Sequence, residues 1–145
     1  MNLKEHLEVA RVAYVGAILE SMAKQLNRCH LCLGARFGEE IPGCWTHGSV
    51  RTVGDCYEGR VWQQSGIGPA VRMVPGNLLV SIDLDLDEDD AYLRVQCEGA
   101  TTMERAIRTS VDAEVVAGWI VDQWEALVCQ ARGYAPLDTN RRCYV

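Results

Sequence analysis

The chain has 145 residues, 48% of them apolar, with 14 Lys and Arg against 20 Asp and Glu and a formal net charge of −6. This is the composition of one globular domain, over residues 1–145, that is long enough to bury a core without a disulfide or a metal. The acidic balance argues against a protein that binds nucleic acid directly, and no segment approaches the roughly 20 apolar residues of a membrane span.

Residues 3–26 are predicted to form an amphipathic helix. Apolar side chains recur there every three or four positions in a single stripe: Leu3, Leu7, Ala10, Tyr14, Ile18, Met22 and Leu26. Other apolar residues flank the stripe, so this helix needs cover on two sides. The domain's own sheet and second helix would provide it, or a second copy of the chain would, which makes a homo-oligomer through the N-terminal helix one expectation. Residues 27–49 contain several Gly and one Pro and are predicted to be a loop.

From about residue 50 the apolar period changes to two, which indicates β-strands. The clearest strand covers 78–86, and a turn at Pro75-Gly76 predicts a hairpin that pairs Met73 with Leu78. After it, a four-residue turn at 87–90 predicts the pairing of Leu84 with Leu93.

Two further segments, 59–63 and 102–111, are predicted as strands with weaker patterns. The second also fits a helix, because Thr101 and Glu104 could form a capping box. Residues 113–132 show a helical stripe that Gly133 and Pro136 would end. The predicted fold class is therefore α+β: an antiparallel β-meander of about four to five strands flanked by an N-terminal and a C-terminal α-helix.

Cysteine and histidine side chains with zinc-ligand spacing follow the first helix: Cys29, Cys32, Cys44 and His47. Two pairs that are each separated by two residues predict a structural zinc site with four protein ligands. Cys29 would then lie at the C-terminal end of the first helix. The competing interpretation is that these are ordinary reduced thiols, since the chain has seven cysteines and an odd, scattered set suits a reducing compartment such as the cytoplasm.

Residues 83–90 concentrate the charge of the chain. They contain six acids and no base, so the remaining acids equal the 14 basic residues in number: Asp83, Asp85, Asp87, Glu88, Asp89 and Asp90. We interpret the segment as an acidic prong that binds a basic groove on a partner protein. The alternative is a solvated turn in which Asp83 lies opposite Arg94 across the hairpin. A calcium loop does not fit, because Glu88 occupies the position that requires glycine.

These features predict a small, non-catalytic binding or regulatory protein. A sharper version is an inhibitor of a nucleic-acid-handling complex, of the type that phages and mobile elements use against host defence. The alternative is a small enzyme or a structural zinc-bearing module whose pocket is built by loops 27–69. A pocket that contains His47 and Cys56 would favour the enzyme.

Overall fold

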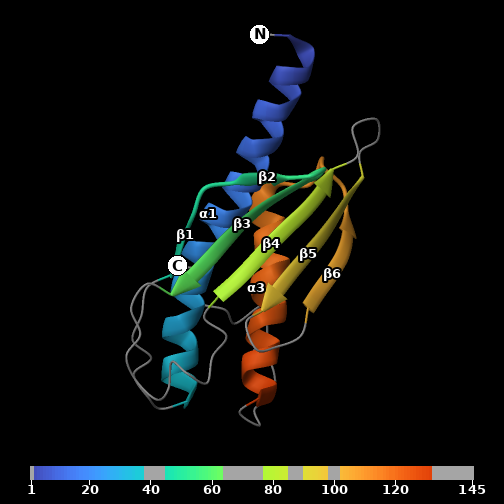
Figure 1. Ribbon diagram of the computed structural model, residues 1–145. Coiled ribbons are helices and arrows are strands. Elements are labelled where there is room, and N and C mark those ends of the chain that lie inside the picture. The colour runs from blue at the N-terminus through green and yellow to red at the C-terminus, as the bar shows by residue number, and fades with distance from the viewer. Residues whose placement is uncertain (1, 38–44, 64–76, 85–89, 98–101, 132–145) are drawn as a thin grey trace.

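The computed structural model of the chain describes residues 2–37, 45–63, 77–84, 90–97 and 102–131, with 30–37 and 131 described by their backbone alone. The described residues form two helices and six strands in the following order (Figure 1): α1 (Leu3–Phe37), β1 (Trp45–His47), β2 (Arg51–Val53), β3 (Cys56–Gln63), β4 (Asn77–Leu84), β5 (Ala91–Cys97), β6 (Thr102–Ile107) and α3 (Ala113–Ala131). All strand pairs are antiparallel, in the order β1-β3-β4-β5-β6, with β2 also paired to β3. The α+β class with a helix at each end is confirmed.

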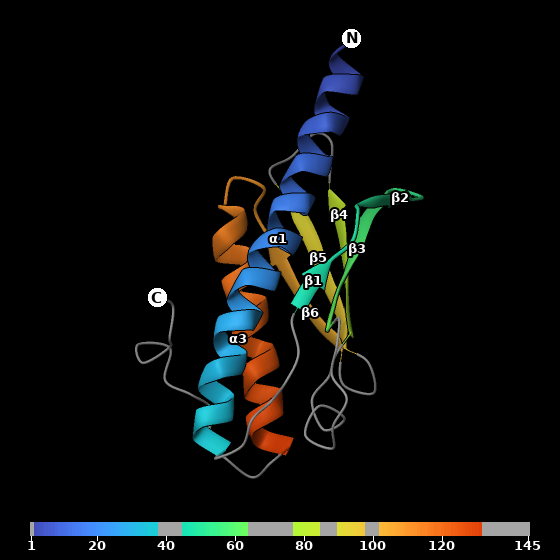
Figure 2. The ribbon, with the colours of Figure 1, turned by 90° about the vertical axis from the view of Figure 1, so that its left-hand side faces the viewer.

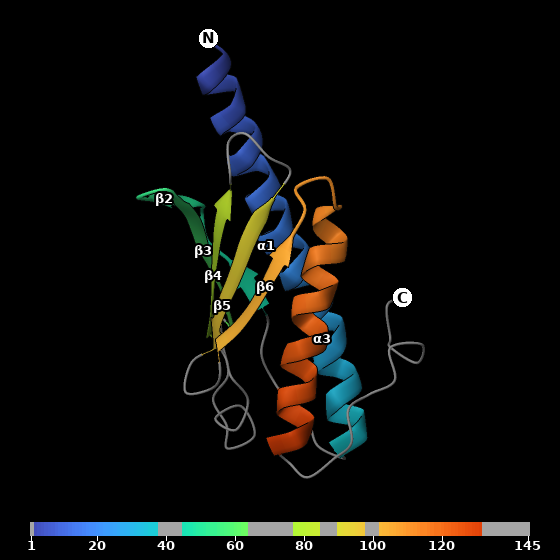
Figure 3. The same ribbon diagram turned by 90° about the vertical axis from the view of Figure 1, so that its right-hand side faces the viewer.

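The molecule has two layers. Both helices lie side by side on the same face of the sheet, and no described helix covers the other face (Figures 2 and 3). The alternating burial of β4 and β5 follows from this arrangement, because successive side chains point to opposite faces of a strand. The core lies between the layers, and its largest fully buried apolar side chains come from both: Ile18, Leu19, Met22, Leu26, Leu78, Ile82, Leu93, Ile120 and Trp124.

Helix α1 is longer than the sequence predicts. The loop predicted over 27–49 is wrong in its first part, since the helix continues to Phe37, and wrong again over β1. The strand predicted over 59–63 is confirmed as part of β3, so the pocket-building loops predicted over 27–69 are interrupted by helix and strand. Asn27 lies inside the helix, and its side chain binds the next strand. Its Oδ1 accepts a hydrogen bond from the Trp45 amide at 2.7 Å, and its Nδ2 donates to the Trp45 carbonyl at 3.3 Å.

The close packing of α1 on the sheet depends on a glycine. A Cβ atom at Gly59 in β3 would lie 2.3 Å from Leu19 Cδ1, far inside van der Waals contact. Leu19 is fully buried in a closely packed core, so a shift of its side chain must displace neighbouring atoms. The absence of a side chain at Gly59 therefore sets how closely the helix approaches the strand.

Strands β1 and β2 occupy the same edge of β3 and are separated by a bulge. His47 pairs with Val61 and Arg51 pairs with Glu58, so three residues on one strand face two on the other. At the far end, Gly54 has a φ of 60° in the two-residue turn that joins β2 to β3. Glycine adopts this left-handed conformation without steric cost, and the turn brings Asp55 to the end of the sheet.

The predicted register of the β4–β5 hairpin is wrong by two residues. Leu84 pairs with Ala91 instead of Leu93, and Asp83 lies opposite Tyr92 instead of Arg94. A shift of two residues keeps every side chain on its predicted face, so the apolar pattern cannot distinguish the two registers. The predicted pairing of Met73 with Leu78 lies outside the described residues.

The segment from Thr102 is a strand, as predicted, but it ends at Ile107 instead of residue 111, and the helical alternative is wrong. Arg105, a charged side chain in an otherwise apolar strand pattern, lies with its guanidinium carbon 5.0 Å from the centre of the Trp119 ring on α3. This cation–π contact explains why the strand tolerates a charge there. The predicted C-terminal helix is confirmed as α3.

Candidate functional site

The two described members of the predicted zinc set lie in different surroundings. Cys29 is inside α1 instead of at its end, is 2% exposed, and donates a thiol hydrogen bond at 2.6 Å to Glu125 Oε2 on α3, itself 1% exposed. His47 is on the exposed part of β1. The Cys32 side chain and Cys44 lie outside the described residues.

Strand β1 leads away from Cys29. Asn27 holds Trp45, and five residues later Val50 Cγ2 lies 3.8 Å from the position of a Cβ on Gly16. The chain from Trp45 onward therefore runs towards the N-terminus of α1, whereas Cys29 lies on the C-terminal side of Asn27. Over the described ranges, no three His, Cys, Asp or Glu side chains are grouped closely enough to hold a metal ion. The four-ligand zinc site stays a prediction.

Cys56 and His47 are not brought together. Cys56 is the first residue of β3 and lies on the outer face of the sheet. His47 pairs with Val61, which lies on the helix side of β3 and is five residues, or roughly 16 Å, further along the strand than Cys56. Partial burial raises the pKa of the Cys56 thiol, and the carboxylates of Asp83, Asp55 and Glu58 raise it further. A nucleophilic cysteine needs the opposite, a positive environment that lowers its pKa.

Two of the six predicted partner-binding acids lie in the described part of the chain, and both are exposed at the same end of the sheet. Asp83 is next to the last residue of β4, and Asp90 immediately precedes β5. Neither has a salt bridge to another described residue. Asp85, Asp87, Glu88 and Asp89 lie outside the described residues.

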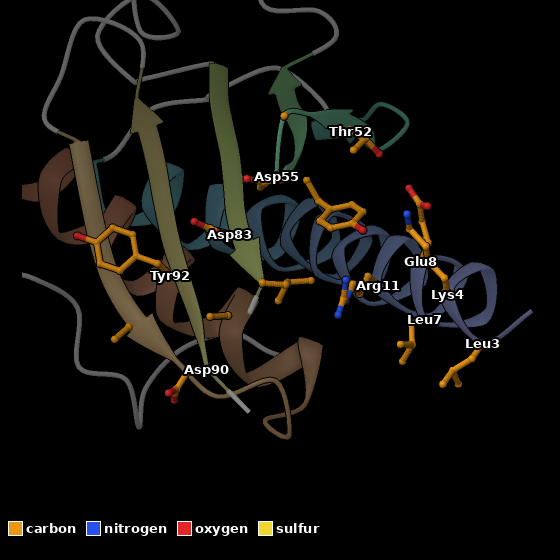
Figure 4. A pocket seen from close by; sticks show the side chains of 15 residues that line it. Leu3, Lys4, Leu7, Glu8, Arg11, Thr52, Asp55, Asp83, Asp90 and Tyr92 are labelled. Atoms are coloured by element: carbon orange, nitrogen blue, oxygen red, sulfur yellow. The ribbon is translucent and has the colours of Figure 1, made fainter. Parts of the chain in front are cut away.

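Asp83 and Asp90 line a groove of about 1170 Å³ between the end of the sheet and the first turns of α1 (Figure 4). The sheet wall includes Asp55 from the β2–β3 turn and the side chains of Tyr57 and Tyr92, and no Lys or Arg of the described strands lines it. The helix wall is made by one face of α1: Leu3, Lys4, Leu7, Glu8 and Arg11. The groove therefore has one acidic wall and one mixed apolar and charged wall.

The outer face of the sheet carries Asp83 and Tyr92 at the end that borders the groove, and two salt bridges further from it. Arg51 forms a salt bridge with Glu58, and Arg94 Nε lies 2.9 Å from Glu104 Oε1. Tyr92 also donates a hydrogen bond to Glu104 Oε2 at 2.6 Å. This bond lowers the pKa of the Glu104 carboxyl and raises the pKa of the Tyr92 hydroxyl, because it stabilises the carboxylate and the protonated phenol.

Sequence reasoning located Asp83 and Asp90 but missed Asp55 and the helix wall. Asp55 is a lone acid in the sequence, and only the β2–β3 turn brings it beside the acidic segment. Leu3 and Leu7 were predicted as part of a buried stripe, yet they are 74% and 40% exposed. Nothing in the apolar pattern indicates that the first turns of α1 extend beyond the end of the sheet.

The comparisons with known proteins identify no relative: no family model, curated protein or solved structure matches the chain. Neither described helix contains an apolar stretch long enough to cross a membrane.

Proposed function

We propose that this protein is a small, non-catalytic binding protein that regulates a partner protein by holding a basic part of its surface at the acidic end of the sheet. The observation that carries the proposal is the wall formed by Asp55, Asp83 and Asp90, which has no salt bridge to any other described residue. Carboxylates without a paired base create a negative potential that attracts a basic partner and orients it on approach.

The sharper form of the proposal concerns the nature of the partner. The acids between Asp83 and Asp90 continue the same run in the sequence, and this density of charge resembles that of a nucleic-acid backbone. We therefore propose that the partner's basic surface normally holds nucleic acid, and that the protein acts as an inhibitor by occupying it. A cytoplasmic location fits this role, and the free thiols of Cys56 and Cys97 suit a reducing compartment.

The test combines Asp83→Asn with Asp90→Asn and compares affinity capture from native cell extract by this variant and by the wild type. The matched control combines Glu20→Gln with Glu114→Gln, which removes the same charge from exposed positions outside the groove. We expect the wild type and the control to capture the same partner and to release it at moderate salt, because exposed charges are screened within about 8 Å at physiological ionic strength. Added duplex DNA should compete for the partner.

Equal capture by the Asp83→Asn, Asp90→Asn variant and by the wild type would refute the acidic docking site. If the captured partner is insensitive to added DNA, docking stands but the inhibitor role is wrong.

A further inference from the structure

The first turns of α1 extend beyond the sheet and have no cover in the described structure (Figures 1 and 2). Every residue from 2 to 10 is exposed, whereas Ile18, on the same helix, is fully buried. Leu7 precedes Ile18 by three helical turns and so points to the same side of α1. The face that forms the core further along the helix is therefore continued by Leu3 and Leu7 into the groove.

We propose that the groove binds an amphipathic α-helix of the partner protein, with its apolar stripe on Leu3 and Leu7 and its Lys or Arg side chains facing Asp55, Asp83 and Asp90. This inference rests on the proposed function for the role of the acidic wall, and it adds the structure and the apolar component of the bound segment. Helix binding in a groove characteristically uses apolar anchors one or two turns apart, and Leu3 and Leu7 are one turn apart.

The geometry of the groove favours a helix over an extended strand. An added strand needs the free amide and carbonyl groups at the side of an edge strand. The groove lies across the ends of the strands: β4 and β5 are central and already paired on each side, and the edge strands contribute only Thr52 of β2 and Ala106 of β6 to its lining. The other wall is a helix that offers about 12 Å between Leu3 and Arg11, and a second helix packs on such a surface at 8–10 Å.

Charge also separates a basic helix from the other possible occupants. An anionic membrane surface would face the three carboxylates of the sheet wall and be repelled by them. The N-terminal helix of a second copy would bring Lys4 and Arg11, but also Glu5 and Glu8, into the same acidic surroundings. A partner helix with basic residues beside its apolar stripe can pack on the leucines of α1 and pair its charges with the carboxylates of the sheet wall.

The probe is a fluorescein-labelled 18-residue peptide of leucine and lysine with leucines at helical spacing, and its binding is followed by fluorescence anisotropy. A second peptide replaces every leucine by glutamine and keeps the charge. We expect the leucine peptide to bind at least ten times more tightly than the glutamine peptide. Leu3→Gln combined with Leu7→Gln should weaken binding of the leucine peptide about tenfold.

The matched control is Val9→Gln, which changes an apolar residue of α1 that is 57% exposed, a value between those of Leu7 and Leu3, and that does not line the groove. It should bind the peptide as the wild type does. All three positions are exposed, so the folded state should survive these changes, and circular dichroism checks this.

The outcomes separate the two proposals. If the Leu3→Gln, Leu7→Gln variant binds like the wild type while Asp83→Asn with Asp90→Asn weakens binding, the acidic site stands and the helix groove is refuted. If only the leucine changes matter, the groove stands and acidic docking is refuted. If the protein binds vesicles with anionic lipid and the leucine variant does not, the apolar face belongs to a membrane contact instead. If the wild type forms a dimer in sedimentation velocity and the leucine variant does not, the apolar face belongs to a contact with a second copy.

Discussion

Replacement of Gly59 by alanine tests the contact that sets the distance between α1 and the sheet. The new methyl group would lie 2.3 Å from Leu19 Cδ1, so either Leu19 or the helix must move. Leu19 is fully buried, and overpacking of this kind costs about 1–3 kcal/mol. At about 3 °C for each kcal/mol in a domain of this size, the Tm should fall by roughly 3–9 °C.

The cost should depend on Leu19. Leu19→Ala alone should lower the free energy of unfolding by about 2–5 kcal/mol, because it leaves a cavity. Leu19→Ala removes the three atoms nearest to the new methyl group, all of which belong to the Leu19 side chain. Alanine also restricts the unfolded chain more than glycine does, so Gly59→Ala in the Leu19→Ala protein should be neutral or stabilising by up to about 1 kcal/mol. Urea unfolding of the four proteins, followed by tryptophan fluorescence, measures the coupling.

Gly16→Ala is the matched control. A Cβ at Gly16 would have Val50 Cγ2 as its nearest neighbour at 3.8 Å, an ordinary contact, and glycine inside a helix is less favourable than alanine by about 1 kcal/mol. This variant should therefore be at least as stable as the wild type. An equal loss of stability on Gly59→Ala with and without Leu19 would show that the close approach of α1 to β3 is not the cause, and the reasoning would fail.

Two further predictions concern a polar contact and a buried thiol. Asn27→Ala removes the side chain that binds the backbone amide and carbonyl of buried Trp45, and it should lower the free energy of unfolding by about 1–3 kcal/mol. Asn27→Asp keeps the acceptor and should retain part of this stability. Urea unfolding that finds both variants equal to the wild type would contradict the prediction. Burial raises the pKa of Cys97 from 9.0 to about 11. The folded state therefore keeps this proton between pH 9 and 11 when the unfolded chain loses it, and stability should fall across that range by up to about 3 kcal/mol. Cys97→Ala should remove this part of the pH dependence, and an unchanged pH profile would refute the assignment.

Local pattern determined most of α1, the strands β4 and β5 with the face that each buries, and α3, but it did not identify 27–37 as helix or β1 as a strand. The alternation in β4 and β5 and the apolar stripe of α3 are properties of neighbouring residues, so they are readable without knowledge of the fold. The concentration of acids at 83–90 is likewise a property of the sequence alone, and it placed Asp83 and Asp90 in the candidate site.

Tertiary structure decided everything that depends on residues far apart in the chain. The observed β4–β5 register differs by two residues from the predicted one, and the sequence could not show this because period-two alternation is unchanged by such a shift. The Asn27 side chain, which the sequence predicts at the start of a loop, lies within α1 and binds the backbone of Trp45, eighteen residues later. The groove exists because the sheet ends beside Asp55, Asp83 and Asp90 while α1 extends past it, and relative position of this kind leaves no trace in the apolar pattern.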